Sequence, residues 1–312
     1  MIKAQNILLV GATGLIGGWI LDAVIANKQE FQRIAIFTSQ KSLEHKKERI
    51  EDLRSKHVEI VVGDIRDAKS VADAFEGFDT IISALGRDAL LEQISLIDIA
   101  EQSKSVKWFF PSEYGTDIEY GPQSVHEKPH QLKLKVRERL RKIDENNLIF
   151  TCVVTGPFAD GYIGPLTLGP RGGGFDAREK KANLLGDGDG KISLTTMADV
   201  GKLVVAALLH PEASRNRALK VNSFTTTPND ILAEFQKQTG EKQWDVTYTP
   251  LDDLKKIEEH AWADKLPSAT PLTLRRIWTE GGTLYEKRDN ELIGDPPMET
   301  LSDAVRRSLA SY

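Results

Sequence analysis

The chain has 312 residues, of which 40% are hydrophobic and 28% are charged. This length is too great for one small core and favours a domain of roughly 150 residues followed by a second one. A net charge of -5 leaves no excess of positive charge for binding a phosphodiester backbone, so nucleic acid is not expected as the main partner.

The sequence also points away from the secretory route. Its single cysteine, Cys152, cannot form an internal disulfide, and the N-terminus lacks the basic-then-apolar pattern of a signal peptide. No apolar run approaches the roughly 20 residues that a membrane span needs. We therefore expect a cytoplasmic protein with no membrane partner that is a monomer or a homodimer.

Short apolar runs alternate with segments of helical periodicity through the first half of the chain. Runs that are apolar on both faces are typical of strands buried between two helical layers. The pattern therefore predicts an α/β fold with a Rossmann-type, doubly wound parallel sheet. We expect strands at 7–10, 34–37, 58–62, 80–83, 108–110 and 149–154, and helices at 15–26, 42–56, 68–75, 86–102, 129–145.

The composition changes after the sixth predicted strand, because residues 155–174 are rich in glycine and proline. Beyond that loop, segments 182–185 and 191–194 flank Gly186–Gly190, whose Asp-Gly pairs predict a hairpin. A helix is expected at 196–210, followed by segments at 219–222, 229–239, 246–249 and 251–263. This mixture predicts a smaller α+β domain.

A glycine motif follows the first strand and opens the first helix. The first glycine permits a tight turn, the second lets the backbone approach a pyrophosphate, and the third allows close helix–sheet contact. The helix N-terminus offers free N–H groups and a positive dipole to the anion. This placement predicts a dinucleotide site at Gly11, Thr13, Gly14, Leu15, Ile16 and Gly17.

The second strand ends without the carboxylate that an NAD site uses to bind the ribose 2′-OH. Thr38 and Ser39 can donate hydrogen bonds there, and Lys41 can supply positive charge, with Arg33 or Lys46 as further sources. We therefore expect NADP(H) as the cofactor. Each of these lysines also fits a plain solvated helix face.

Two more strand ends lie where ligands of open α/β sheets bind. Asp64 follows the third strand, where it can meet the adenine edge. Ala84, Leu85 and Gly86 follow the fourth strand, next to the expected nicotinamide ribose. With these sites, residues 1–157 are expected to form the NADP-binding domain and 158–312 mainly the substrate-binding domain, while residues from about 181 to 213 could return to the first.

A reductase also needs a proton donor, and the obvious candidate is missing. None of the six tyrosines has a lysine four residues later, so the Tyr-x-x-x-Lys arrangement is absent. The sequence shows neither metal-ligand spacing nor a Ser/His/Asp arrangement. The candidates that remain are the segment 109–117, which follows a buried strand, and the start of the helix at 130–137.

These segments resemble the isoflavone reductase-like, or NmrA-like, branch of atypical short-chain dehydrogenases, which includes phenylcoumaran benzylic ether and pinoresinol–lariciresinol reductases. The resemblance rests on the GATGxxG turn, the phrase F-F-P-S-E-Y-G-T-D, and Lys133-x-x-Val136-Arg137. It implies that Lys133 is the catalytic lysine. Further cofactor contacts are expected at Pro111, Ser112, Glu113, Lys133, Gly156, Pro157 and Phe158, and substrate contacts at Tyr114, His130 and Tyr162.

The resemblance implies an NADPH-dependent reductase of a small aromatic or conjugated secondary metabolite, with Lys133 as proton donor or acceptor. The alternative is a non-catalytic, NADP-binding redox sensor, which also occurs among NmrA-like proteins. Each site residue has an ordinary reading as well. Lys133 could be a surface lysine, Glu113 a loop carboxylate, His130 a helix-terminal residue and Tyr114 a packing residue.

Overall fold

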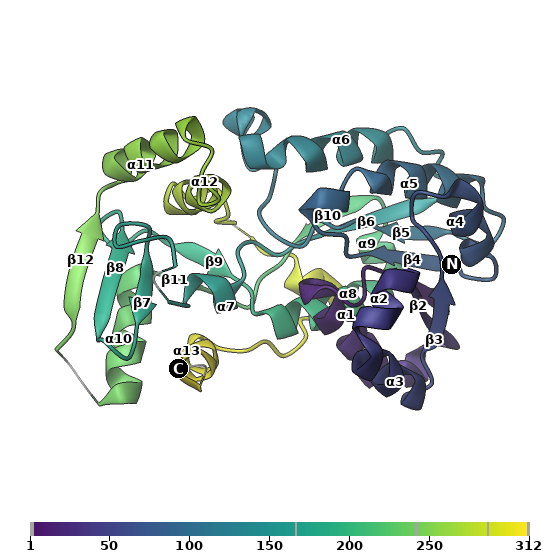
Figure 1. Ribbon diagram of the computed structural model, residues 1–312, viewed down its shortest axis with the longest axis horizontal. Coiled ribbons are helices and arrows are strands. Elements are labelled where there is room, and N and C mark those ends of the chain that lie inside the picture. Colours follow the sequence, from purple (N-terminus) through teal and green to yellow (C-terminus); the bar gives the residue numbers. More distant parts are fainter. Residues whose placement is uncertain (1–2, 166, 241–242, 286, 311–312) are drawn as a thin grey trace.

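The computed structural model describes residues 3–165, 167–240, 243–285 and 287–310. Its largest element is a seven-stranded sheet in the order β10-β6-β5-β4-β1-β2-β3, in which every pairing is parallel (Figure 1). The order in which strands are added changes sides between β1 and β4, because β2 and β3 lie on one side of β1 and the later strands lie on the other. Folds of this kind bind their ligands at such a switch point. The strands are β1 (Asn6–Val10), β2 (Arg33–Thr38), β3 (Glu59–Val62), β4 (Thr80–Ser83), β5 (Trp108–Phe110), β6 (Ile149–Val154) and β10 (Arg217–Lys220).

Helices cover both faces of this sheet. Successive strand residues point to opposite faces, so Leu9 and Ile36 join one apolar cluster while Leu8 and Ala35 join another. The first cluster includes α1 (Leu15–Ala26), α3 (Lys47–Ser55) and α8 (Met197–Leu209), and the second includes α4 (Ala68–Phe75), α5 (Glu92–Gln102) and α6 (Gln131–Leu140). The predicted doubly wound parallel sheet is therefore confirmed.

The second half of the chain forms a smaller unit of helices and two small sheets, at the left of Figure 1. One sheet has the order β12-β8-β7 and the other pairs β11 with β9. The strands are β7 (Gly174–Asp176), β8 (Lys181–Leu185), β9 (Ile192–Leu194), β11 (Phe224–Thr226) and β12 (Asp245–Thr249). The helices are α7 (Ala159–Tyr162), α10 (Pro228–Thr239), α11 (Leu251–Ala263), α12 (Ala269–Thr279) and α13 (Leu301–Ala310).

The hairpin predicted for 182–185 and 191–194 is wrong. β8 pairs with β7 and β12, whereas β9 pairs with β11. The intervening turn is held by the start of α10 instead, because the Asn229 backbone donates to the Gly188 carbonyl at 3.0 Å and its side chain donates to Asp189 at 2.8 Å. The Asp-Gly pairs therefore mark a connection between two sheets.

Three predicted helices differ from the sequence pattern, one of them being 86–102, which becomes a 3₁₀ turn, η2 (Arg87–Ala89), followed by α5. The segment 42–56 divides into α2 (Gln40–His45) and α3, and the segment 129–145 becomes a 3₁₀ turn, η4 (Lys128–His130), followed by the shorter α6. The chain also returns to the large sheet after β9, because α8 packs on α1, α9 (Pro211–Ser214) follows it and β10 pairs with β6. The functional division at residue 157 remains a prediction.

Candidate active site

The glycine turn after β1 is packed tightly against the end of β4. Gly11 has a φ of +82°, and a Cβ at this position would lie 2.6 Å from the Ala84 carbonyl oxygen. A Cβ on Gly17 would lie 2.2 Å from the Gly11 carbonyl oxygen. The Gly14 amide donates to that same oxygen at 2.9 Å. No larger residue fits at Gly11 or Gly17 without moving the turn away from the sheet.

The amino end of α1 is suited to an anion. No side chain caps the helix at Gly14, and its first turn contains no acidic residue. The first amides of a helix have no partner within the helix, and the helix dipole adds partial positive charge there. Leu15 is 70% exposed at this end. The backbone of Thr13, Leu15 and Ile16 thus lies at an open, electropositive edge.

The end of β2 presents polar groups to the same edge, but a different lysine reaches the glycine turn. Lys46 donates its Nζ hydrogen bond to the Thr13 carbonyl oxygen. Lys41 is exposed on α2, and Ser39 caps that helix by accepting from the Ser42 amide at 3.2 Å. Thr38 is buried at the strand end. Of Lys41 and Lys46, it is therefore Lys46 that contacts the glycine turn.

Arg33 cannot serve as a further cation at this edge. It begins β2, at the opposite end of the strand from Thr38. Its guanidinium donates twice to Glu59, with both distances 2.7 Å, and lies over the Phe78 ring. Asp64, by contrast, is exposed beyond the end of β3, where it accepts from the Arg66 amide at 2.9 Å.

The loops after β4 and β5 are joined by Ser112. Its Oγ donates to the Leu85 carbonyl oxygen at 2.9 Å, and its amide donates to the buried Gln93 side chain at 2.7 Å. Ala84, Leu85 and Gly86 therefore lie beside Pro111, Ser112 and Glu113. The structure thus brings the predicted residues of these two strand ends together at the carboxyl edge of the sheet.

The Glu113 carboxylate is buried in an ion pair and is not available to a ligand. Glu113 is 1% exposed, and its two oxygens accept from the Arg137 guanidinium at 3.2 and 3.0 Å. Arg137 also donates to Glu119 at 2.6 Å. The neighbouring buried Asp117 is paired with Lys220 at 2.9 Å. Only the backbone of Glu113 can take part in the site.

Lys133 lies beside that backbone. Its Nζ donates to the Glu113 carbonyl oxygen at 3.0 Å. Burial lowers the pKa of Lys133 from its ordinary value. The negative charge of Glu113 opposes this shift, whereas the positive charges of Arg137 and Arg87 add to it. Lys135, two residues later, is exposed on the same helix. The two lysines therefore differ in environment although they are close in sequence.

A cavity of about 210 Å³ surrounds the Lys133 side chain. Residues from three strand-end loops and from α12 form its walls, and none of them is acidic. Besides Lys133, the lining consists of Arg87, Tyr114, Gly115, Thr116, Ile118, Pro129, His130, Gly156, Pro157, Phe158, Leu274 and Trp278. The cavity is apolar over most of its lining and carries two basic side chains, Arg87 and Lys133, so it favours an uncharged or electron-rich ligand over a cation.

His130 has a fixed tautomer. It is 1% exposed, and its Nδ1 lies 3.0 Å from the Ser124 carbonyl oxygen. A carbonyl oxygen can only accept, so Nδ1 carries the hydrogen. Burial lowers the pKa of His130, which favours the neutral ring. The enclosed Nε2, which has no partner among the described residues, is then a hydrogen-bond acceptor.

The two candidate tyrosines have different positions. Tyr114 lines the cavity, and burial raises the pKa of its hydroxyl, which has no partner in the described part of the chain. Tyr162 is absent from the lining. It packs edge-on against Trp278 with ring centroids 6.0 Å apart, and Arg275 lies 4.3 Å over its ring. Tyr162 supports the wall from behind, which argues against a direct substrate contact.

Sequence reasoning missed Arg87 and Leu274, which also line the cavity, and it singles out Trp278 only as one of three tryptophans of the second half that suit the walls of an aromatic site. Arg87 immediately follows the Gly86 predicted at the cofactor edge, so its position after β4 was an available signal. The tryptophan content of the second half was a weaker one. Nothing in the local pattern of α12 indicates that its Leu274–Trp278 face meets the loops of the sheet.

Among the described residues, no group of three or more His, Cys, Asp and Glu side chains could hold a metal ion. In the same part of the chain, no helix has the length and apolar character required to cross a membrane.

Comparison with known sequences identifies one family. The profile of the NmrA-like family matches residues 3–277. Oxidoreductase aprR of Aspergillus flavus is 31% identical over 299 residues, which are 93% of this chain and 94% of the relative. Phenylcoumaran benzylic ether reductase Pyrc5 of Pyrus communis is 28% identical over 264 residues, covering 84% and 83% of the two chains.

Solved structures support the same fold. A structure from a study of pinoresinol-lariciresinol and phenylcoumaran benzylic ether reductases has a TM-score of 0.82 at 20% identity, covering 99% of this chain and 100% of the other. The binary complex of leucoanthocyanidin reductase with NADPH from Vitis vinifera has a TM-score of 0.79 at 18% identity, covering 98% and 100%. At these identities the likeness concerns the fold.

Proposed function

The chain belongs to the NmrA-like family, as the sequence motifs predicted, and from this premise we propose that it is an NADPH-dependent reductase of small aromatic or conjugated compounds. The observation that carries the proposal is the position of Lys133. Its amino group is enclosed in a cavity without acidic lining residues, at the edge of the sheet that also carries the glycine turn. The relatives named as reductases support the same activity.

The residues at the strand ends fit NADP(H). Gly11 and Gly17 let the turn pack closely against the end of β4 and the start of α1, and the uncapped α1 offers amides to a pyrophosphate. When bound, the nicotinamide supplies the hydride. We assign cofactor contacts to Gly11, Thr13, Gly14, Leu15, Ile16, Gly17, Thr38, Ser39, Lys41, Lys46, Asp64, Ala84, Leu85, Gly86, Pro111, Ser112, Lys133, Gly156, Pro157, Phe158 and the backbone of Glu113.

The size and lining of the cavity support a small aromatic substrate. Its volume of about 210 Å³ lies below the roughly 300–1,000 Å³ of typical ligand pockets, which suits one aromatic ring with a short side chain. Trp278, Phe158 and Tyr114 provide flat apolar walls for such a ring. The His130 Nε2 acceptor favours a substrate that presents a hydroxyl group.

Lys133 is assigned the proton chemistry. In the reductive direction the substrate gains a hydride and develops negative charge, which the Lys133 ammonium can stabilise and then neutralise by donating a proton. The Glu113 carbonyl oxygen holds that ammonium group in place. Arg87 adds a second positive charge to the cavity wall.

The test is NADPH oxidation against a panel of enones, quinone methides and aryl ethers, followed by the Lys133→Ala variant. We expect kcat to fall by roughly 10²–10⁴, the range for loss of a general acid, while NADPH binding stays within a few-fold. Lys135→Ala is the matched control and should retain full turnover. If Lys133→Ala remains as active as the control on a confirmed substrate, the assignment of the proton chemistry is wrong.

A further inference from the structure

A second, larger hollow is lined by two of the elements that also line the cavity containing Lys133. It has a volume of about 730 Å³ and lies between the segment after Tyr120 and the helices α11 and α12. The same two elements line both spaces. On one side, Glu127 and Lys128 face the outer hollow while Pro129 and His130 face the cavity, and on the other side α12 likewise contributes residues to each.

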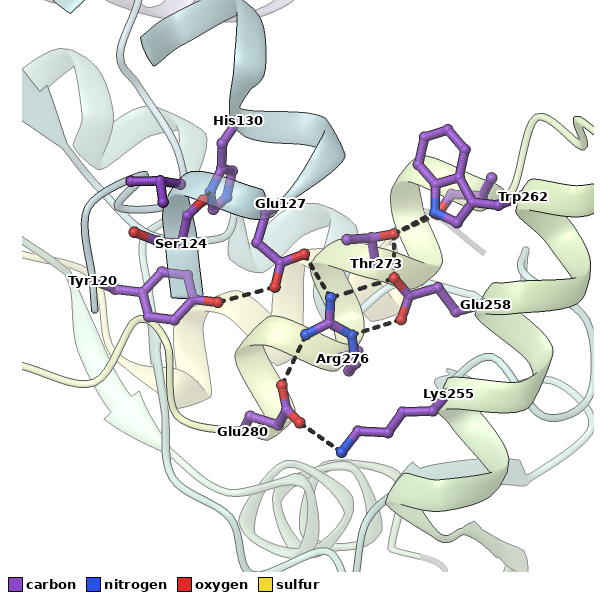
Figure 2. A network of polar contacts seen from close by, with 12 residues as sticks. Tyr120, Ser124, Glu127, His130, Lys255, Glu258, Trp262, Thr273, Arg276 and Glu280 are labelled. Carbon is purple, nitrogen blue, oxygen red and sulfur yellow. Dashed lines mark hydrogen bonds and ion pairs between the residues drawn. The ribbon is translucent and has the colours of Figure 1, made fainter. Parts of the chain in front are cut away.

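An ion pair joins these two elements. Arg276 on α12 donates from Nη2 to Glu127 Oε2 at 2.6 Å, and the two side chains are only 14% and 11% exposed. The Tyr120 hydroxyl donates to the other Glu127 oxygen at 3.2 Å. Glu127 in turn positions the cavity wall, since its carbonyl oxygen accepts from the His130 amide at 3.0 Å. Figure 2 shows Arg276 reaching from α12 toward Glu127.

Arg276 has other partners that remain when Glu127 is removed. Its Nε donates to Glu258 of α11 at 2.6 Å, and its Nη1 donates to Glu280 at 2.9 Å (Figure 2). Glu280 is also paired with Lys255 of α11 at 2.9 Å. These contacts hold α11 and α12 together. Among the contacts of Arg276 in the described structure, the one with Glu127 is the contact that reaches the segment carrying His130.

The crossing is polar rather than apolar. Across the described residues, no apolar cluster joins the segment 120–130 to α11 or α12. Lys128 also lies 4.4 Å over the Trp262 ring across this crossing, and beside it the Trp278 indole donates to Thr116 at 2.9 Å. Contacts of this kind between two parts of a chain separate more readily than a shared core.

We propose that the Glu127–Arg276 ion pair is a gate between the outer hollow and the cavity that contains Lys133, and that substrate enters through it. Opening the gate joins the two spaces, and closing it holds the substrate between His130 and Trp278. The proposal rests on the proposed function only in naming what enters. The route itself is argued from the two spaces, from the two elements that line both, and from the ion pair in the outer hollow that joins those elements.

The test measures access to the cavity without any turnover. Leu274, which lines the cavity on α12, is replaced by cysteine, and its reaction with the neutral aromatic disulfide 4,4′-dithiodipyridine is followed by absorbance. The native Cys152 is buried, and burial raises the pKa of its thiol, so it stays silent. In this background, Glu127→Gln should accelerate labelling by about 5–30-fold, because it removes a charge-assisted bond.

The matched control is Glu280→Gln, which removes another carboxylate of Arg276 without touching the crossing. Its labelling rate should stay within about twofold of the parent, since Glu280 is a partly exposed partner. Raised salt should accelerate labelling of the parent and leave Glu127→Gln unchanged. Equal rates in all three proteins, or equal acceleration by both substitutions, would overturn the gate.

Glu127→Asp provides a second variant if Glu127→Gln does not fold, because it keeps the charge and shortens the reach; an intermediate labelling rate is expected. The outcome is independent of the reductase assignment. Gated labelling without turnover would support the gate and contradict the proposed function. Ungated labelling with turnover that depends on Lys133 would contradict the gate and support the proposed function.

Discussion

The two walls of the cavity are built differently. Lys133, His130 and Tyr114 belong to the unit of the large sheet, where buried charges are paired as in Glu113–Arg137 at 3.0 Å. The opposite wall is α12, which meets that unit through polar contacts such as Trp278 to Thr116. The difference suggests that the reacting groups are fixed by the fold, whereas the wall that selects the substrate is able to move.

The largest expected effect is on the fixed wall. Arg137→Met leaves the Glu113 carboxylate buried without its partner, which typically costs about 3–5 kcal/mol in the free energy of unfolding. Arg141→Met is the control on the same helix, because Arg141 is 57% exposed and pairs only with Glu119 in the described structure. That change should cost less than about 1 kcal/mol. Urea unfolding measures both, and equal losses would contradict a fixed wall built on the buried pair.

The cofactor edge of the fixed wall gives the next effect. A 2′-phosphate that meets a cation and two donors gains on the order of 1.5–3 kcal/mol, or roughly tenfold to hundredfold in affinity. Thr38→Asp should therefore shift the preference from NADPH toward NADH, and Lys46→Ala should weaken NADPH binding more than Lys47→Ala does. Calorimetric titration that shows equal or tighter NADH binding by the unaltered protein would contradict this assignment.

The movable wall should respond to a smaller change. Trp278→Phe removes a bond worth about 0.5–1.5 kcal/mol, so KM for a substrate found in the panel should rise by roughly two- to tenfold with NADPH affinity unchanged. Trp262→Phe is the matched control, because its indole also donates to a threonine hydroxyl, Thr273 at 2.8 Å, without lining the cavity. Steady-state kinetics would contradict the comparison if both variants shifted KM alike.

The pH dependence of turnover should show the smallest change. Burial lowers the pKa of Lys133 below its ordinary value. A proton donor works in its ammonium form, so kcat should fall as the pH rises through that lowered pKa, and the fall should begin below pH 10.5. Lys133→Arg keeps the charge at every accessible pH. Any activity that it retains should lack this alkaline limb, and an unchanged limb would assign the titration to another group.

The large sheet could be predicted from the sequence because its strands are buried on both faces and read as uninterrupted apolar runs. The glycine turn was equally readable, since Gly11 and Gly17 occupy positions where only glycine fits. The failed hairpin shows the limit. Turn residues indicate that the chain bends, but the partners of β8 and β9 are set by contacts with β12, β11 and α10, which are distant in sequence.

The site was predictable in the same uneven way. The strand-end residues follow from motifs that lie next to predicted strands, and Lys133 follows from the family resemblance. Trp278 and Leu274, by contrast, reach the cavity only through the packing of α12. From sequence position alone, Lys41 was preferred to Lys46 as the cation for the 2′-phosphate. The break between α2 and α3 places Lys46, and not Lys41, against the glycine turn. The pairing of the Glu113 carboxylate with Arg137 could not be predicted, because it is a tertiary contact.

The most direct test of the central claim is to follow the hydride itself. The protein is incubated with NADPH that carries deuterium at both hydrogens of nicotinamide C4 and with each compound of the panel, and the product masses are measured by mass spectrometry. The account predicts that one deuterium from the cofactor appears in the product, and that this transfer is lost in Lys133→Ala and kept in Lys135→Ala. Tight NADPH binding with no transfer to any compound would contradict the reductase and favour the redox-sensing alternative.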